Sequence, residues 1–307
     1  MGRFVGLIHR HPRLLNCLLA EGGDAFQRPA DYPLAGWGLG YHQGARVLLQ
    51  KERVDPGGRV DFPSLARTLQ TSDLICHVHR PPEGHWTYEN AQPFGHQGWV
   101  CAHHGRVPGH EEVRELRTMM LDGVAPFLRR NVQGCSDTEV LFHLYLTELH
   151  RHHQLPGVRV DPAGAAEAMR ALIARVEGMV ARCVGQAQLA ELQLTLVVSS
   201  GDVLVAAAVG VPLHWRLMTT IPRCRVCSEE TDPRERRPPR LERHEDLTAT
   251  WVVSGLTLDG AAPDPSWTLV PDRTVLWANR SGEVRMTPLG PPRTTTSSGL
   301  TPIPRSR

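Results

Sequence analysis

The first third of the chain consists of short apolar runs, each about one strand long and separated by turn residues. The runs are RFVGLIH, GWGLGYH, ARVLLQKE, LICHVHR and GWVCAHHG. Gln43 and Gly44, between the second and third runs, predict a hairpin. Pro81 and Pro82 end the fourth run, because proline cannot donate a hydrogen bond to a sheet. Short helices are expected at NCLLAEGGDAF and near residues 62–69.

The pattern then changes to the helical period. Apolar residues recur at helical spacing in three segments, EEVRELRTMML, SDTEVLFHLYLTELHRHH and AGAAEAMRALIARVEGMVARC. Ser136 or Asp137 is the expected N-cap of the second segment. One face of that helix should carry Leu141, Leu144, Tyr145 and Leu149.

Strand patterns return in the last third, in the runs LQLTLVVSS, GDVLVAAAVG, PLHWRLMT, TATWVVSGL, SWTLV, TVLWAN and EVRMTPL. Strands segregated from helices favour an α+β fold, with two antiparallel sheets between two helix layers. No linker or internal repeat interrupts the pattern, so we predict one domain over residues 2–288. Residues 229–246 are rich in charge and proline and are expected to form a loop. Residues 289–307 have few apolar side chains and are expected to be disordered.

Composition narrows the function classes. The 307 residues carry a net charge of only +2, which does not favour a nucleic-acid partner. No apolar run approaches the ~20 residues of a membrane-spanning helix. The N-terminus lacks a secretory pattern, so a cytoplasmic location is expected. The basic residues are nearly all arginine, which we interpret as the mark of a bacterial source. Seven cysteines at irregular spacing do not suggest a disulfide framework.

Five short motifs give the chain a family resemblance. They are GWGLGYH, HVHR, NAQPF, AHHG and GCSDTEVLF. In order and spacing they resemble the GWG, HVR, NxHPF, HNG and SDSE motifs of class II glutamine amidotransferases. The resemblance covers roughly residues 2–288 and implies the four-layer αββα sandwich of N-terminal-nucleophile hydrolases. It implies hydrolysis of the side-chain amide of glutamine or a γ-glutamyl compound, without a cofactor.

The resemblance also shows where this chain departs from the family pattern. The family nucleophile is a cysteine that follows Met1, and that position is Gly2 here. The arginine that binds the substrate carboxylate is replaced by His79. Arg80 is the next residue, but neighbouring side chains of a strand point to opposite faces. The asparagine that stabilises the oxyanion is replaced by His104, whereas Gly105 is kept.

Other family positions are unchanged. Asn90 is kept, and Asp137 stands where the family binds the α-ammonium group of its ligand. Gln92 replaces the histidine of NxHPF. The framework is therefore retained while the reaction centre is lost, and we expect no glutaminase activity of the family type.

Three functional hypotheses remain open. The first is a pseudoenzyme that binds an amino-acid-like or γ-glutamyl ligand, or serves as the partner subunit of another enzyme. The second is a hydrolase of altered chemistry in the same pocket, dependent on a metal or on histidine. The third is an amidotransferase whose nucleophile was removed by protein engineering.

Histidines and cysteines offer further candidates. His77 and His79 share one strand face, and Cys101 and His103 share a face that we expect to lie opposite. Together with His104 and the nearby Asp137, these histidines could bind zinc or another divalent metal. The alternative, which we favour, is that His77 and His103 are framework histidines with hydrogen-bonding roles.

Four of the cysteines could have a chemical role. Cys76 and Cys101 could replace the nucleophile, but buried thiols are the commoner case. Cys224 and Cys227 form a C-x-x-C sequence, which could be half a zinc site or a redox pair, with His214 and His244 as loose ligand candidates. Surface cysteines without function are the interpretation we favour.

Overall fold

The computed structural model describes residues 2–26, 34–55, 60–65, 68–79, 86–155, 160–222, 224, 226, 244, 247–256 and 264–291. Arg80 and Cys227 lie outside these residues. So do most of the charge-rich segment 229–246 and the C-terminal segment from residue 292, so the expected disorder of the tail stays a prediction.

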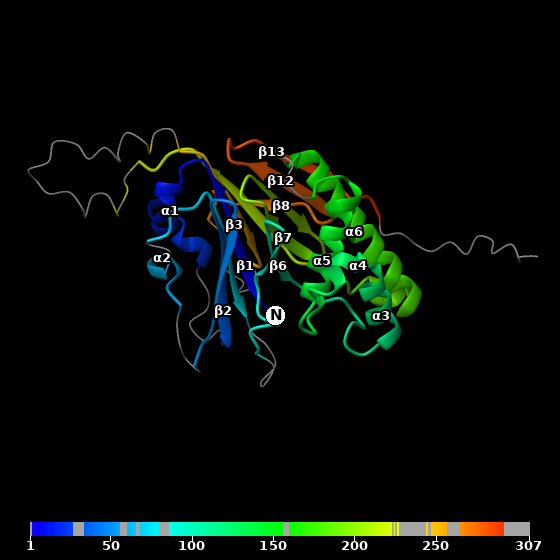
Figure 1. The fold of residues 1–307 in the computed structure, drawn as a ribbon. Coiled ribbons are helices and arrows are strands. Elements are labelled where there is room, and N and C mark those ends of the chain that lie inside the picture. Colours follow the sequence, from blue (N-terminus) through cyan, green and yellow to red (C-terminus); the bar gives the residue numbers. More distant parts are fainter. Residues whose placement is uncertain are drawn as a thin grey trace, which may run out of the picture.

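Two antiparallel sheets form the middle of the molecule (Figure 1). Sheet A has the strand order β11 (Thr268–Val270), β9 (Leu213–Met218), β10 (Ala249–Ser254), β1 (Arg3–His9), β4 (Asp73–His79), β2 (Gly36–Gln43), β3 (Arg46–Arg53). Sheet B has the order β13 (Val284–Pro288), β12 (Thr274–Asn279), β8 (Val203–Ala208), β7 (Thr195–Ser199), β6 (Trp99–His104), β5 (Phe94–His96).

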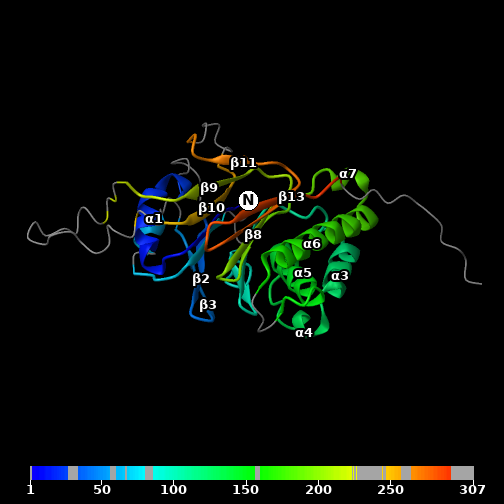
Figure 2. The same cartoon turned by 90° about the horizontal axis from the view of Figure 1, so that it is seen from above.

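Helices cover the outer face of each sheet, which confirms the expected αββα layers (Figures 1 and 2). On sheet A lie α1 (Leu15–Glu21), α2 (Phe62–Leu65) and the 3-10 turns η1 (Pro12–Leu14) and η2 (Gly23–Phe26). On the sheet B side lie α3 (Arg114–Gly123), α4 (Pro126–Arg129), α5 (Asp137–Arg151), α6 (Pro162–Cys183) and α7 (Gln186–Leu189). In the described part of the chain, no helix is both long and apolar enough to span a membrane.

Helix α5 is more deeply buried than its sequence suggests. Its N-cap is Ser136, whose Oγ accepts a hydrogen bond from the Thr138 backbone N–H. The sequence indicates a single apolar face, yet every residue from Thr138 to Leu149 is buried. The helix lies between sheet B, α4 and α6, so polar side chains such as Thr147 are enclosed with the apolar ones.

The space between the sheets is filled by the alternate residues of each strand that point inward. Phe4 and Ile8 of β1, Val100 and Ala102 of β6 and Ala206 of β8 belong to this apolar layer. Because successive side chains of a strand point to opposite faces, Gly2, His77 and His104 lie on the same inner side.

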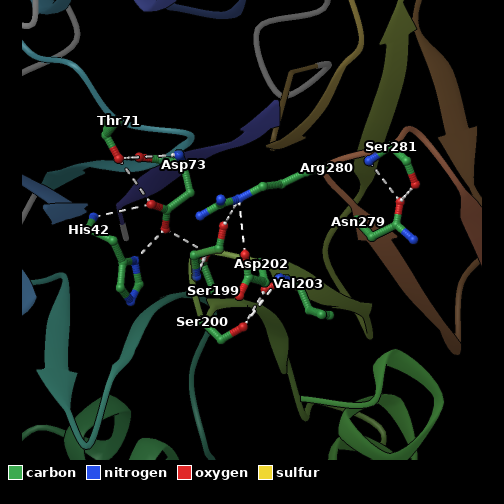
Figure 3. Close-up of polar contacts among 11 residues, drawn as sticks. His42, Thr71, Asp73, Ser199, Ser200, Asp202, Val203, Asn279, Arg280 and Ser281 are labelled. Atoms are coloured by element: carbon green, nitrogen blue, oxygen red, sulfur yellow. Dashed lines mark hydrogen bonds and ion pairs between the residues drawn. The ribbon is translucent and has the colours of Figure 1, made fainter. Parts of the chain in front are cut away.

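A buried polar network closes the inner layer near the C-terminal end of β1 (Figure 3). Asp73 Oδ2 accepts hydrogen bonds from His42 Nδ1 at 2.8 Å and from Ser199 Oγ at 2.6 Å. Asp73 Oδ1 accepts from the His42 backbone N–H and from Thr71 Oγ1. The network therefore links β2 and β4 of sheet A to β7 of sheet B.

His42 carries a proton on both ring nitrogens in this network. Its Nε2 lies 3.0 Å from the Gly98 carbonyl O, and its Nδ1 contacts the Asp73 carboxylate, so both partners can only accept. Burial alone lowers the pKa of His42, but the hydrogen bond and charge of Asp73 outweigh it and raise that pKa. Burial raises the pKa of Asp73, but His42 and Ser199 outweigh it and lower that pKa.

Candidate functional site

The position of the family nucleophile is Gly2, at the start of β1, and it is buried. Arg3 pairs with Val78 of β4, which places Gly2 beside the end of that strand. A Cβ added to Gly2 would lie 2.5 Å from His77 Nε2 and closer still to the Val78 carbonyl O. Position 2 therefore has no side chain, and the neighbouring β4 leaves no room for one unless it shifts.

His77 and His79 lie beside Gly2 on the inner face of β4, with their ring centroids 5.7 Å apart. Burial, followed by the neighbouring His79 and His104, holds the pKa of His77 well below its usual value. Burial also lowers the pKa of His79 to about 4. Both rings are therefore neutral near pH 7. Neither nitrogen of His77 has a hydrogen-bond partner among the described residues, and neither does Nδ1 of His79.

His104 occupies the oxyanion position at the end of β6. Its Nδ1 lies 3.0 Å from Ser254 Oγ of β10, so it bridges the two sheets. Burial lowers the pKa of His104 to about 3. Gly105 follows with a φ of 147°, and a Cβ there would lie 2.7 Å from Gln193 Cβ. The glycine of the family motif is thus required by the backbone itself.

His103 does not face His77 and His79, contrary to the expectation from the strand pattern. It points to the helix layer, where its Nε2 donates to the Gln193 carbonyl O at 2.9 Å and its Nδ1 lies 3.1 Å from Thr138 Oγ1. Cys101 packs in the same helix-side core. The predicted direction of the His103 side chain was wrong. The even-numbered residues of β6 point to the space between the sheets, so His104 faces sheet A and His103 faces the helices.

The side chains of Asn90 and Asp137 accept hydrogen bonds from backbone N–H groups of other segments. Asn90 Oδ1 accepts from the Cys135 backbone N–H at 2.8 Å. Asp137, at the first turn of α5, accepts from the Val107 N–H at 3.0 Å and stays half-buried. A carboxylate has several lone-pair directions, so Asp137 retains the capacity to bind an ammonium group.

Gln92 shows how the framework adapts to the loss of the family histidine. Its Oε1 accepts from the His103 backbone N–H at 2.6 Å, and its Nε2 donates to Thr138 Oγ1 at 3.1 Å. The glutamine therefore ties β6 to α5 as a structural link.

The two cysteines on the site strands are unsuited to nucleophilic chemistry. Cys76 and Cys101 are fully buried, and burial raises the pKa of each thiol far above its usual value. A thiol must ionise to act as a nucleophile, so both are inert in the folded chain.

Ser199, His42 and Asp73 are the residue types of a hydrolase triad, but their connections are different. Ser199 Oγ donates to Asp73, and His42 Nε2 contacts the Gly98 carbonyl O. In a triad the histidine accepts the proton of the serine. The network is therefore structural.

A small pocket of about 30 Å³, little more than the volume of one water molecule, lies at the same end of sheet A. Arg3, Phe62 and Val78 line it from the outer face, and Ser254 reaches it as well. Arg3 alternates with Gly2 and Phe4 along β1, so its guanidinium lies on the other side of the sheet from His79. It does not replace the missing carboxylate-binding arginine.

Replacing Gly105 by alanine is expected to destabilise the protein by about 1–3 kcal/mol, because the added Cβ meets Gln193 at a φ that L-residues avoid. Urea denaturation measures this change. Gly178→Ala in α6 is the matched control, since no atom lies within 4 Å of its added Cβ. A neutral or stabilising Gly105→Ala would contradict the backbone requirement.

The sandwich, with the start of β1 buried at one end of the inner layer, is the architecture of the N-terminal-nucleophile hydrolases. Residues 15–215, more than half of the chain, match the sequence model of the family described as glutamine amidotransferases class-II. The chain belongs to this family. No curated protein matched it.

Solved structures share the fold at low identity. A glutamine aminotransferase class-II domain protein from Silicibacter pomeroyi is 18% identical with a TM-score of 0.54, over 94% of this chain and 100% of that one. A predicted glutamine amidotransferase from Pseudomonas aeruginosa is 14% identical with a TM-score of 0.50, over 92% and 98%. An allosteric regulatory enzyme of purine biosynthesis is 16% identical with a TM-score of 0.51, over 94% and 49%.

Two buried groups of side chains were not predicted as groups from the sequence. One is the network of His42, Asp73 and Ser199, which come from three strands on two sheets. The other joins Cys17 to Cys224 and His244. Cys224 and His244 of the second group were candidate metal ligands, but the expectation that Cys224 lies at the surface was wrong, because it is buried. The C-x-x-C sequence was the available signal for the second group, but nothing local to Cys17 connected it to that sequence.

Proposed function

We propose that this chain is a pseudoenzyme of the class II glutamine amidotransferase family, without glutaminase activity. The observation that carries the proposal is the crowding at Gly2. The His77 ring and the Val78 carbonyl O occupy the place where the side chain of a nucleophile would begin. A cytoplasmic, bacterial setting remains our expectation from composition.

The charge of the site supports the same conclusion. Family catalysis needs a cation for the substrate carboxylate and a donor for the oxyanion. His79 and His104 stand at these positions, and burial lowers the pKa of His79 to about 4 and that of His104 to about 3. Two neutral rings in an enclosed site cannot bind a carboxylate as an arginine fork does.

The retained Asp137 suggests what the site does instead. We propose that it binds the ammonium group of an amino-acid-like or γ-glutamyl ligand, either for the chain's own purpose or on behalf of a partner enzyme. The hydrogen-bonding nitrogens of His77 and Nδ1 of His79 are available to polar atoms of such a ligand.

The purified chain is expected to release no ammonia or glutamate above the blank from glutamine or γ-glutamyl amides. An electrophilic glutamine analogue should not label position 2, which offers no sulfur. Coupled-enzyme detection of glutamate and intact-mass spectrometry measure these outcomes. Hydrolysis of glutamine above the blank by the unmodified chain would contradict the proposal.

Ligand binding is expected to depend on Asp137. Isothermal titration with glutamine and γ-glutamyl amides should show a signal in the unmodified chain that Asp137→Asn weakens at least tenfold, since charge-assisted bonds are the stronger ones. Asp122→Asn, at an exposed carboxylate paired with Arg129, is the matched control. Equal affinity of both variants would remove Asp137 from the site.

A further inference from the structure

Three soft metal ligands meet in the layer outside sheet A, away from the site described above. Cys17 lies on α1, and Cys224 and His244 belong to the connection between β9 and β10. One ligand atom of each residue lies within 4.8 Å of the other two. The exposed fractions are 3% for each cysteine and 2% for His244, so the cluster is enclosed.

The three residues lie far apart in the sequence, so their contact does not follow from being neighbours in the chain. Cys17 is more than two hundred positions from Cys224, and His244 follows after a segment rich in charge and proline. Cys224 also opens a C-x-x-C sequence, the spacing that recurs in zinc sites. Its second cysteine lies outside the described residues, and the proposed site consists of the three residues that meet.

Thiolate sulfur and imidazole nitrogen are the ligands that structural zinc prefers. Around a tetrahedral zinc with Zn–S near 2.3 Å and Zn–N near 2.0–2.1 Å, ligand atoms lie roughly 3.6–3.8 Å apart. The observed upper limit of 4.8 Å is within a small side-chain adjustment of that geometry.

The surroundings favour a site that is neutral and closed. Cys17 and Cys224 belong to the apolar cluster that includes Leu18 and Trp251. Two thiolates and one Zn²⁺ sum to zero charge. Burying this neutral group in an apolar layer costs less free energy than burying the thiolates or the Zn²⁺ separately.

We propose that Cys17, Cys224 and His244 provide three of the four ligands of one zinc ion with a structural role, and that a water molecule completes the tetrahedron. Binding exchanges the two thiol protons for the metal, so two protons are released and zinc affinity falls at acid pH. The ion would join α1 to the connection that runs from Met218 of β9 to Ala249 of β10. The site is independent of Gly2 and of the proposed ligand.

Elemental analysis of the full chain, purified without a histidine tag and without chelator, should find one zinc ion per chain. Cys17→Ser, Cys224→Ser and His244→Gln should each lower the zinc content, and the triple variant should abolish it. Cys135→Ser, at an exposed cysteine, is the matched control and should keep the zinc.

A second measurement separates metal loss from misfolding. The unmodified chain, stripped by a chelator and refilled with Co²⁺, should show the visible bands of a tetrahedral thiolate site and a higher melting temperature. The proposal is overturned if the folded chain binds neither zinc nor Co²⁺, or if the triple variant retains zinc. A Cys17–Cys224 disulfide, detected by mass spectrometry after alkylation, would overturn it as well.

Discussion

Asp73→Asn is expected to lower the free energy of unfolding by about 3–5 kcal/mol, because it removes one partner of a fully buried ion pair. His42 would keep its contact with Gly98 but lose the charge that balances its second proton. The Ser199 hydroxyl and the His42 backbone N–H would also lose their carboxylate acceptor. Urea denaturation of the two proteins at pH 6 measures the difference.

Asp202→Asn is the matched control for this variant. Asp202 pairs with Arg280 at 3.2 Å, but the aspartate side chain is 69% exposed. Solvent screens such a pair, so the variant should change stability by at most ~1 kcal/mol. Equal effects of the two substitutions would show that the buried network contributes no more than a surface contact.

The contribution of the network should also depend on pH. The pKa of His42 is raised in the folded chain, so its stabilisation is full below the unfolded value of ~6.5 and is lost as pH rises through the folded value. The pKa of Asp73 is lowered, so its stabilisation is present above ~3.9 and is lost as pH falls through the folded value. The loss of unfolding free energy caused by Asp73→Asn should therefore be largest at pH values between the two unfolded pKa values, ~3.9 and ~6.5. A difference that is constant from acid to alkaline pH would contradict the charged pair.

Gly2→Cys is expected to destabilise the fold by about 1–3 kcal/mol, because overpacking a filled site forces its neighbours to move. The added Cβ meets the ring of His77 and the backbone of Val78, and a backbone atom cannot rotate away. Gly2→Ala should cost nearly as much, since the clash begins at Cβ. Gly23→Ala is the matched control, with no atom within 4 Å of its added Cβ.

The same crowding limits any attempt to restore glutaminase activity. Gly2→Cys alone should remain at the blank. Combining it with His79→Arg and His104→Asn restores the family residues at three positions, but the Val78 carbonyl O still occupies the nucleophile's place. We therefore expect at most trace turnover in a glutamate-release assay. Turnover comparable to an active family member, or an undiminished melting temperature of Gly2→Cys, would show that the start of β1 moves freely.

The αββα layers followed from periodicity because the apolar spacing of a strand or helix is a local property. The strands around GWGLGYH, HVHR and AHHG were predicted from that spacing and are present as β2, β4 and β6. The short strand β5 and the four-residue helices α4 and α7 were not predicted, because their sequences FGH, PFLR and QAQL show no recurring apolar position.

The candidate site was predictable only in part. Motif order placed Gly2, His79 and His104 at the reaction centre, and the structure brings His77, His79 and His104 around Gly2. The motifs did not show that His103 turns to the helices, since that depends on which face of β6 meets the other sheet.

The sequence by itself determined the class of fold, the family, and the absence of a thiol at the nucleophile position, because each depends on local periodicity or on residue identity. Only the tertiary structure decided that position 2 has no room for a side chain, since the obstacle comes from β4. It also decided that Asp73 is an ion-pair partner and that Cys17 meets His244. Such contacts join segments far apart in the chain, and their geometry depends on strand order and register, which no local pattern encodes.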